Sequence, residues 1–136
     1  MVKVLMAAAG SGKTKVIIDS VNAAAAKEPG TVVCIAKGSA LNLDISHAAR
    51  LVNVSDYIVS DYSSLLGFVA GIHAGNYDIK EIFIDGLYKV ARDEKTEDAE
   101  KFILKLDEFS SKHEVNFTVS MSDDAALASD VLKKYM

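Results

Sequence analysis

Apolar runs alternate with amphipathic stretches along most of this 136-residue chain. Short, nearly continuous apolar runs and one stretch of alternating apolar and polar residues are typical of strands. They predict strands at residues 2–6, 31–36, 82–84 and 115–121. Apolar residues at helical spacing predict helices over residues 12–27, 62–74 and 96–113. Pro29-Gly30 and Gly75-Asn76 supply stop signals after the first two helices.

The order of these elements indicates the fold class. A strand, a helix and a second strand within residues 2–36 form a parallel crossover unit, which is right-handed in nearly all proteins. Continued alternation predicts an α/β three-layer sandwich with a mostly parallel sheet, formed as a single domain over residues 1–136. Ligands of such sheets bind at the carboxyl ends of the strands.

Three stretches are less regular. Residues 44–51 read as a short helix or an irregular segment, and residues 52–59 as a small hairpin around Ser55-Asp56. Residues 90–96 are charged and loop-like, with Thr96 as a cap for the helix that follows. Ser122-Asp123-Asp124 predicts the start of a final helix that reaches about residue 134, with both aspartates as capping acids.

Composition narrows the class of protein. Fifteen Lys and Arg residues stand against 19 Asp and Glu, giving a net charge of −4, and no basic stripe indicates a nucleic-acid partner. The only cysteine, Cys34, lies in an apolar run and reads as a small buried residue, so no disulfide within the chain is expected. No apolar stretch has the length of a membrane span and the start does not resemble a signal peptide, so we expect a cytoplasmic protein.

Residues 7–14, which we call the glycine loop, carry the clearest chemistry. Their sequence, Ala-Ala-Ala-Gly-Ser-Gly-Lys-Thr, lies between a predicted strand and a predicted helix. Small residues allow successive backbone N–H groups to surround a phosphate, and the positive end of the helix dipole faces the same anion. The alternative is a flexible turn that leads into a helix.

In this context the glycine loop resembles the Walker A motif of the P-loop NTPases, with Ala7 in place of the usual first glycine. The resemblance implies that Lys13 contacts the terminal phosphates in a catalytic role and that Thr14 ligates Mg²⁺. It also implies a set of nucleotide-binding residues: Ala9, Gly10, Ser11, Gly12, Lys13, Thr14 and Lys15.

The strand at residues 82–84 ends in Asp85, which resembles the Walker B aspartate and implies a second Mg²⁺ contact. The alternative is that Asp85-Gly86 only forms a turn. RecA-like members of the superfamily often have glutamate directly after this aspartate, where this chain has Gly86. An acid after the second strand is another location for the base, and Asp44 is the nearest candidate downstream.

In the RecA-like class the strand that follows Walker B lies between it and the phosphate-loop strand and carries a polar sensor at its end. The resemblance gives that role to Ser120 or Ser122; the alternative is a helix cap, which is the favoured interpretation for Ser122. Only Arg50 and Arg92 are arginines, which argues against a small-molecule kinase with an arginine-rich lid. Either one is a candidate arginine finger from a neighbouring subunit or a partner in a surface ion pair.

The remaining candidates are less specific. The histidines, His47, His73 and His113, show no metal-ligand spacing. Tyr57, Tyr62, Tyr77 and Tyr88 lie near predicted loops, where they either stack on a nucleobase or pack in a half-buried position.

The sequence therefore predicts a minimal RecA-like protein that binds Mg²⁺-ATP, with hydrolysis that is slow or depends on a partner. A nucleotide-stabilised interaction module without catalysis and a small-molecule kinase are the alternatives. No Asn-Lys-x-Asp string indicates guanine specificity, which favours ATP. With four clear core strands, the glycine-loop strand is expected near an edge of the sheet, and an open edge predicts a homo-oligomer.

Overall fold

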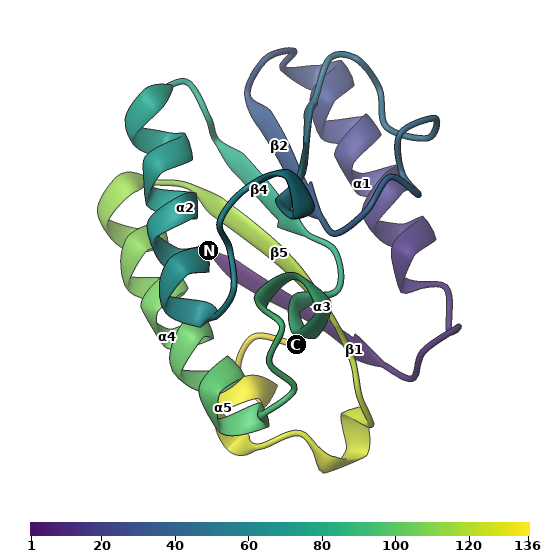
Figure 1. The fold of residues 1–136 in the computed structure, drawn as a ribbon, viewed down its shortest axis with the longest axis vertical. Helices are drawn as coiled ribbons and strands as arrows, with labels where there is room; N and C mark the ends of the chain where they lie inside the picture. Colours follow the sequence, from purple (N-terminus) through teal and green to yellow (C-terminus); the bar gives the residue numbers. More distant parts are fainter.

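A computed structural model describes all residues from Met1 to Met136. The chain forms a parallel β-sheet with helices on both of its faces (Figure 1). The strands are β1 (Val2–Ala7), β2 (Val32–Ala36), β3 (Arg50–Asn53), β4 (Glu81–Ile84) and β5 (Asn116–Ser122). The helices are α1 (Lys13–Lys27), α2 (Tyr62–Gly75), α3 (Leu87–Ala91), α4 (Thr96–His113) and α5 (Asp130–Lys133).

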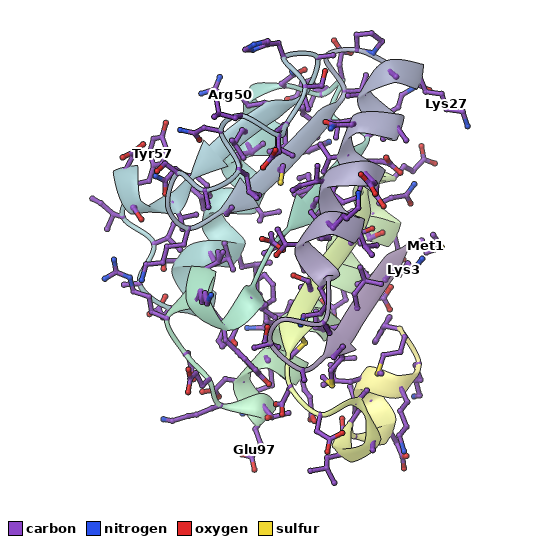
Figure 2. The ribbon with its side chains drawn as sticks, turned by 90° about the vertical axis from the view of Figure 1, so that its right-hand side faces the viewer. Met1, Lys3, Lys27, Arg50, Tyr57 and Glu97 are labelled. Carbon is purple, nitrogen blue, oxygen red and sulfur yellow. The ribbon has the colours of Figure 1, made fainter.

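The five strands lie in the order β1-β5-β4-β2-β3, and all four neighbouring pairs are parallel. The expected α/β class and parallel sheet are confirmed, and the layers are compatible with a three-layer sandwich. β5 lies between β1 and β4, which is the position expected for the strand that follows Asp85. β1 is an edge strand, as predicted, while β3 forms the opposite edge. Figure 2 shows Lys3 of β1 and Arg50 of β3 on opposite sides of the molecule.

The strands are buried on both faces because helices cover both. In β2, for example, Val33 and Ile35 face the larger core under α2 and α4, whereas Cys34 faces the smaller core under α1. This arrangement explains the nearly continuous apolar run of β2, every residue of which is buried. Because all the strands are parallel, their carboxyl ends lie at one end of the sheet, next to the start of α1.

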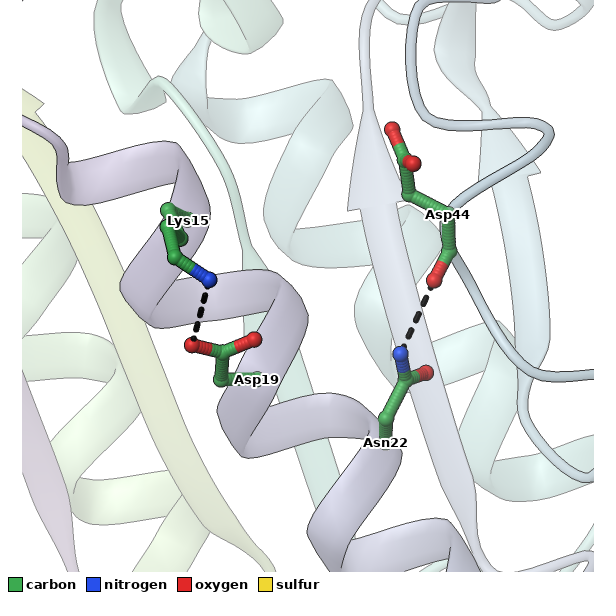
Figure 3. A network of polar contacts seen from close by, with 4 residues as sticks. All are labelled: Lys15, Asp19, Asn22 and Asp44. Atoms are coloured by element: carbon green, nitrogen blue, oxygen red, sulfur yellow. Dashed lines mark hydrogen bonds and ion pairs between the residues drawn. The ribbon is translucent and has the colours of Figure 1, made fainter.

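Residues 37–49 form an irregular segment that lies over the same face as α1. The side-chain amide of Asn22 in α1 holds it by two hydrogen bonds. Nδ2 donates to the Asp44 carbonyl at 2.8 Å (Figure 3), and Oδ1 accepts from the Ser46 backbone N–H at 2.8 Å. Leu41 and Ile45 of this segment are buried against α1. The segment is therefore fixed to the helix although it has no regular secondary structure.

The hairpin predicted at residues 52–59 is wrong. Arg50–Asn53 form β3, parallel to β2, and Val54–Asp56 form a 3-10 turn. Asn53 causes the change of direction, because its Oδ1 accepts from the backbone N–H groups of Gly38, at 2.8 Å, and Ser55, at 3.0 Å. β3 also adds a fifth strand to the four that the apolar pattern predicts.

Two helical predictions also need correction. The single helix expected after Ser122 is a 3-10 turn at Ala125–Leu127 followed by the short α5, because Asp124 and Ser129 each cap a separate turn. Thr96 is the first residue of α4 rather than its cap, a position held by Lys95. The short α3 was not predicted.

Candidate functional site

The glycine loop leaves a row of backbone donors unpaired. The backbone N–H groups concerned donate to no acceptor in the protein: Ala8, Ala9, Gly10, Gly12, Lys13 and Thr14. Gly10 and Gly12 have φ of 77° and 92°, a conformation that glycine adopts without steric strain. α1 begins at Lys13 with no side-chain cap and no acidic residue in its first turn. The loop thus presents free donors and a positive helix end together, the two features that bind anions.

Lys13 lies over this loop. Its Nζ donates to the carbonyl oxygens of Ala7 and Ala8, both at 2.8 Å, and lies 3.3 Å from the Ser11 hydroxyl. These contacts place a full positive charge beside the unpaired N–H groups without pairing it to a carboxylate. No carboxylate compensates the ammonium charge, so an anionic ligand could replace the neutral acceptors that Lys13 now contacts.

Thr14 and Asp85, which are 71 positions apart in the sequence, meet beside the loop. The Thr14 hydroxyl lies 3.4 and 3.3 Å from the two Asp85 carboxylate oxygens. Ser120 of β5 fixes the carboxylate: its hydroxyl donates to Asp85 Oδ1 at 3.0 Å and accepts from the Gly86 N–H at 2.8 Å. Asp85 also donates its backbone N–H to the Ile35 carbonyl at 2.9 Å.

These groups border a cavity of about 580 Å³, which we call the glycine-loop cavity. Its size is within the range of small-molecule sites. The wall comes from the glycine loop, from the ends of β2, β4 and β5, and from α3 and the loop after it. The charged side chains in the wall are Lys13, Lys37, Lys89, Asp85 and Glu94.

None of these five charged groups forms an ion pair, because the only ion pairs of the molecule are Lys15–Asp19 and Lys80–Glu28. The cavity therefore combines three lysines with two carboxylates that do not neutralise them by direct contact. Such a wall suits a ligand that carries several negative charges and also needs a carboxylate nearby.

Sequence reasoning did not assign a role to Lys37, Lys89 or Glu94. For Lys37 a signal existed, because it directly follows a buried strand and so lies at the ligand-binding end of the sheet. Gly38, its neighbour, is held by Asn53. Glu94 gave no such signal, because its position depends on the length of α3 and on the turn at Arg92, which has a φ of 56°.

Several predicted site residues lie elsewhere. Lys15 points along α1 and pairs with Asp19 at 3.2 Å on the exposed surface (Figure 3). Asp44 contacts Asn22 through its carbonyl and does not line the cavity. The cavity wall contains Ser120 and Ser122, but neither Arg50 nor Arg92. The Ser11 hydroxyl contacts Lys13 within the glycine loop, and Ser11 does not line the cavity.

Among the tyrosines, Tyr88 alone lines the glycine-loop cavity. Its hydroxyl donates to Asp123 Oδ2 at 2.8 Å and lies 3.3 Å from Thr96 Oγ1. Burial raises the pKa of Tyr88, so its hydroxyl keeps its proton and remains a donor at neutral pH. Tyr57 borders a different hollow, beside Arg50 (Figure 2).

Cys34 lies in the smaller core. Burial, assisted by the negative charge of Asp85, raises the pKa of its thiol to about 12. The thiol is therefore neutral and inert, as expected for a small buried residue. No group of three or more His, Cys, Asp or Glu side chains is arranged to hold a metal ion.

No protein-family model matches the chain, and no curated protein is significantly similar to it. None of its helices combines the length and the apolar character needed to cross a membrane.

Proposed function

We propose that this protein is a minimal P-loop ATP-binding protein of RecA-like type, which binds Mg²⁺-ATP in the glycine-loop cavity. The observation that carries the proposal is the set of six unpaired N–H groups in the glycine loop, next to the uncompensated charge of Lys13. Each phosphate of a nucleotide offers acceptor oxygens to such donors. The position of β5 between β1 and β4 is also the strand order of the RecA-like class.

The residues beside the loop fit a magnesium ion. Hard oxygen donors are what Mg²⁺ prefers, and it is usually held by one or two protein groups together with water and substrate phosphates. The Thr14 hydroxyl and the Asp85 carboxylate are such donors, and they already lie within 3.4 Å of one another. The ion would neutralise phosphate charge, while Ser120 keeps Asp85 in position.

Hydrolysis belongs to the proposal as a slow or partner-dependent activity, because Gly86 occupies the place next to Asp85. The absence of arginine from the cavity wall argues against phosphoryl transfer to a small molecule. An acceptor-dependent rate would support the kinase alternative. Binding without turnover would support the nucleotide-stabilised interaction module.

Titration calorimetry with Mg²⁺-ATP and Mg²⁺-GTP tests the proposal. We expect the wild type to bind, with ATP preferred, and Lys13→Ala to lose at least about tenfold in affinity, since a charge-assisted hydrogen bond contributes about 1.5–3 kcal/mol. Lys27→Ala is the matched control, because Lys27 lies at the far end of the same helix (Figure 2).

Circular dichroism would establish that each variant is folded. A folded wild type that binds neither nucleotide would refute the proposal, and the glycine loop would then be a turn without a ligand. Equal affinity in Lys13→Ala and the wild type would show that any nucleotide binds elsewhere.

A further inference from the structure

The loop after α3 returns to the glycine-loop cavity and brings Glu94 into its wall. α3 is only five residues long, and Leu87, Val90 and Ala91 are fully buried. The chain reverses at Arg92, whose φ of 56° is left-handed, and the Asp93 N–H donates back to the Tyr88 carbonyl at 3.2 Å. The buried face of α3 thus fixes where the reversal occurs.

The four-residue loop between α3 and α4 is held at several points. The Tyr62 hydroxyl donates to the Asp93 carbonyl at 2.8 Å, and the Lys95 N–H donates to Asp93 Oδ1 at 2.8 Å. The Tyr88 hydroxyl, from the helix before the loop, contacts Thr96, the first residue after the loop, and Asp123, which follows β5. These contacts involve the backbone and Asp93, and they leave the carboxylate of Glu94 without a hydrogen bond or an ion pair.

Glu94 is consequently a free carboxylate on an ordered loop, facing the same cavity as Lys13 and Asp85. The other carboxylate of the wall, Asp85, is held by Ser120 and Thr14. Asp123 is occupied by Tyr88 and by the Asp124 N–H. Among the acids near the glycine loop, only Glu94 combines a place in the cavity wall with unused acceptor oxygens.

We propose that Glu94 is the general base of this protein, acting from the loop after α3 in place of a glutamate next to Asp85. This inference rests on the proposed function. The Glu94 carboxylate accepts a proton from a water molecule as the water oxygen bonds to the γ-phosphorus of ATP. The bond from the γ-phosphorus to the β–γ bridging oxygen breaks, its electron pair leaves with ADP, and the proton on Glu94 passes to the released phosphate or to solvent.

The test compares Glu94→Gln with the wild type by two separate measurements: calorimetric affinity for Mg²⁺-ATP and the rate of phosphate release under saturating nucleotide. The amide retains the size of the side chain but cannot accept the proton. We expect the affinity to change less than about threefold and the turnover to fall by about 10²–10⁴-fold, the usual contribution of a general base. Glu97→Gln is the control, because Glu97 follows three residues later and does not line the cavity.

The two proposals fail in different ways. If the folded wild type does not bind Mg²⁺-ATP, the proposed function is refuted and the base assignment with it. If the wild type binds and Glu94→Gln releases phosphate at the wild-type rate, only the base assignment is overturned. A wild type that binds without measurable turnover would also overturn it, while leaving nucleotide binding in place.

Discussion

At the scale of single residues, the glycine loop keeps glycine only where the backbone requires it. Gly10 and Gly12 have positive φ, whereas Ala7, at the place of the first glycine in the Walker A motif that the loop resembles, does not. Ala7 is the last residue of β1 and pairs with Ser122. The departure from the motif therefore falls at a position where alanine meets no conformational penalty.

Cys34 gives a prediction about pH. Its ordinary pKa of 9.0 rises to about 12 in the folded protein, so between these values the unfolded chain releases a proton that the folded chain keeps. Its contribution to stability is present below pH 9 and is lost as the pH rises toward 12. We expect the free energy of unfolding to fall by up to about 1.4 kcal/mol per pH unit in this interval.

Urea denaturation at several pH values between 8 and 11 measures this slope. Cys34→Ala is the reference, because it lacks the thiol but keeps every tyrosine and lysine that titrates in the same interval. If the free energy of unfolding depended on pH in the same way in both proteins, the raised pKa of Cys34 would be contradicted.

At the scale of elements, the sequence predicted most of what depends on long periodic patterns. The predicted bounds of α1, α2 and α4 agree with the structure to within about one residue. In the structure, Asp61 and Ser64 form a capping box at the start of α2. Short elements were missed because tertiary contacts, not local preference, determine them. β3 exists through its pairing with β2, and α3 through the burial of Leu87 and Val90.

The same division holds for the candidate site. Lys13, Thr14 and Asp85 follow local patterns and were predicted, and the structure places them around one cavity. Glu94 and Lys89 reach that cavity through an unpredicted helix. Lys15 shares the helix with Lys13 but lies two positions further along, which directs its side chain to the exposed surface.

The irregular segment 37–49 gives a prediction about Asn22. Asn22→Ala removes two hydrogen bonds that fix this segment, and we expect a loss of about 1–3 kcal/mol in the free energy of unfolding. Hydrogen exchange at Ser46 should accelerate, because its N–H loses its acceptor. Asn42→Ala is the matched control, since the Asn42 side chain is exposed and makes no hydrogen bond. Equal exchange at Ser46 in the two variants would contradict this role.

At the scale of the whole molecule, β1 leaves one side of the sheet partly open. The Phe117 and Asp123 N–H groups donate to the Met1 and Ala7 carbonyls. The backbone N–H groups of Val2, Val4 and Met6 therefore point away from β5. Of these, Val4 donates its N–H to the Tyr135 carbonyl at 2.8 Å. The last turn of the chain thus covers the middle of the edge and leaves its two ends uncovered.

Self-association through the exposed edge of β1 remains a prediction. Amide hydrogen exchange can show which residues of the edge take part. We expect light scattering to show a species larger than the monomer as concentration rises, with the Val2 and Met6 N–H groups becoming protected from exchange in step with it. Val4 is the internal control, because its bond to Tyr135 protects it at every concentration. A monomer at all concentrations, or association without protection of Val2 and Met6, would contradict the prediction.

The cavity wall has a consequence for the stability of the whole chain. Its residues extend from Ala9 to Ser122 and come from separate segments that only the complete fold brings together. A ligand bound there would hold the glycine loop, the loop after α3 and the end of β5 together, and it would stabilise the folded state because only the folded chain forms its site. Saturating ligand is therefore expected to slow the protease cleavages that require global unfolding, including those far from the cavity.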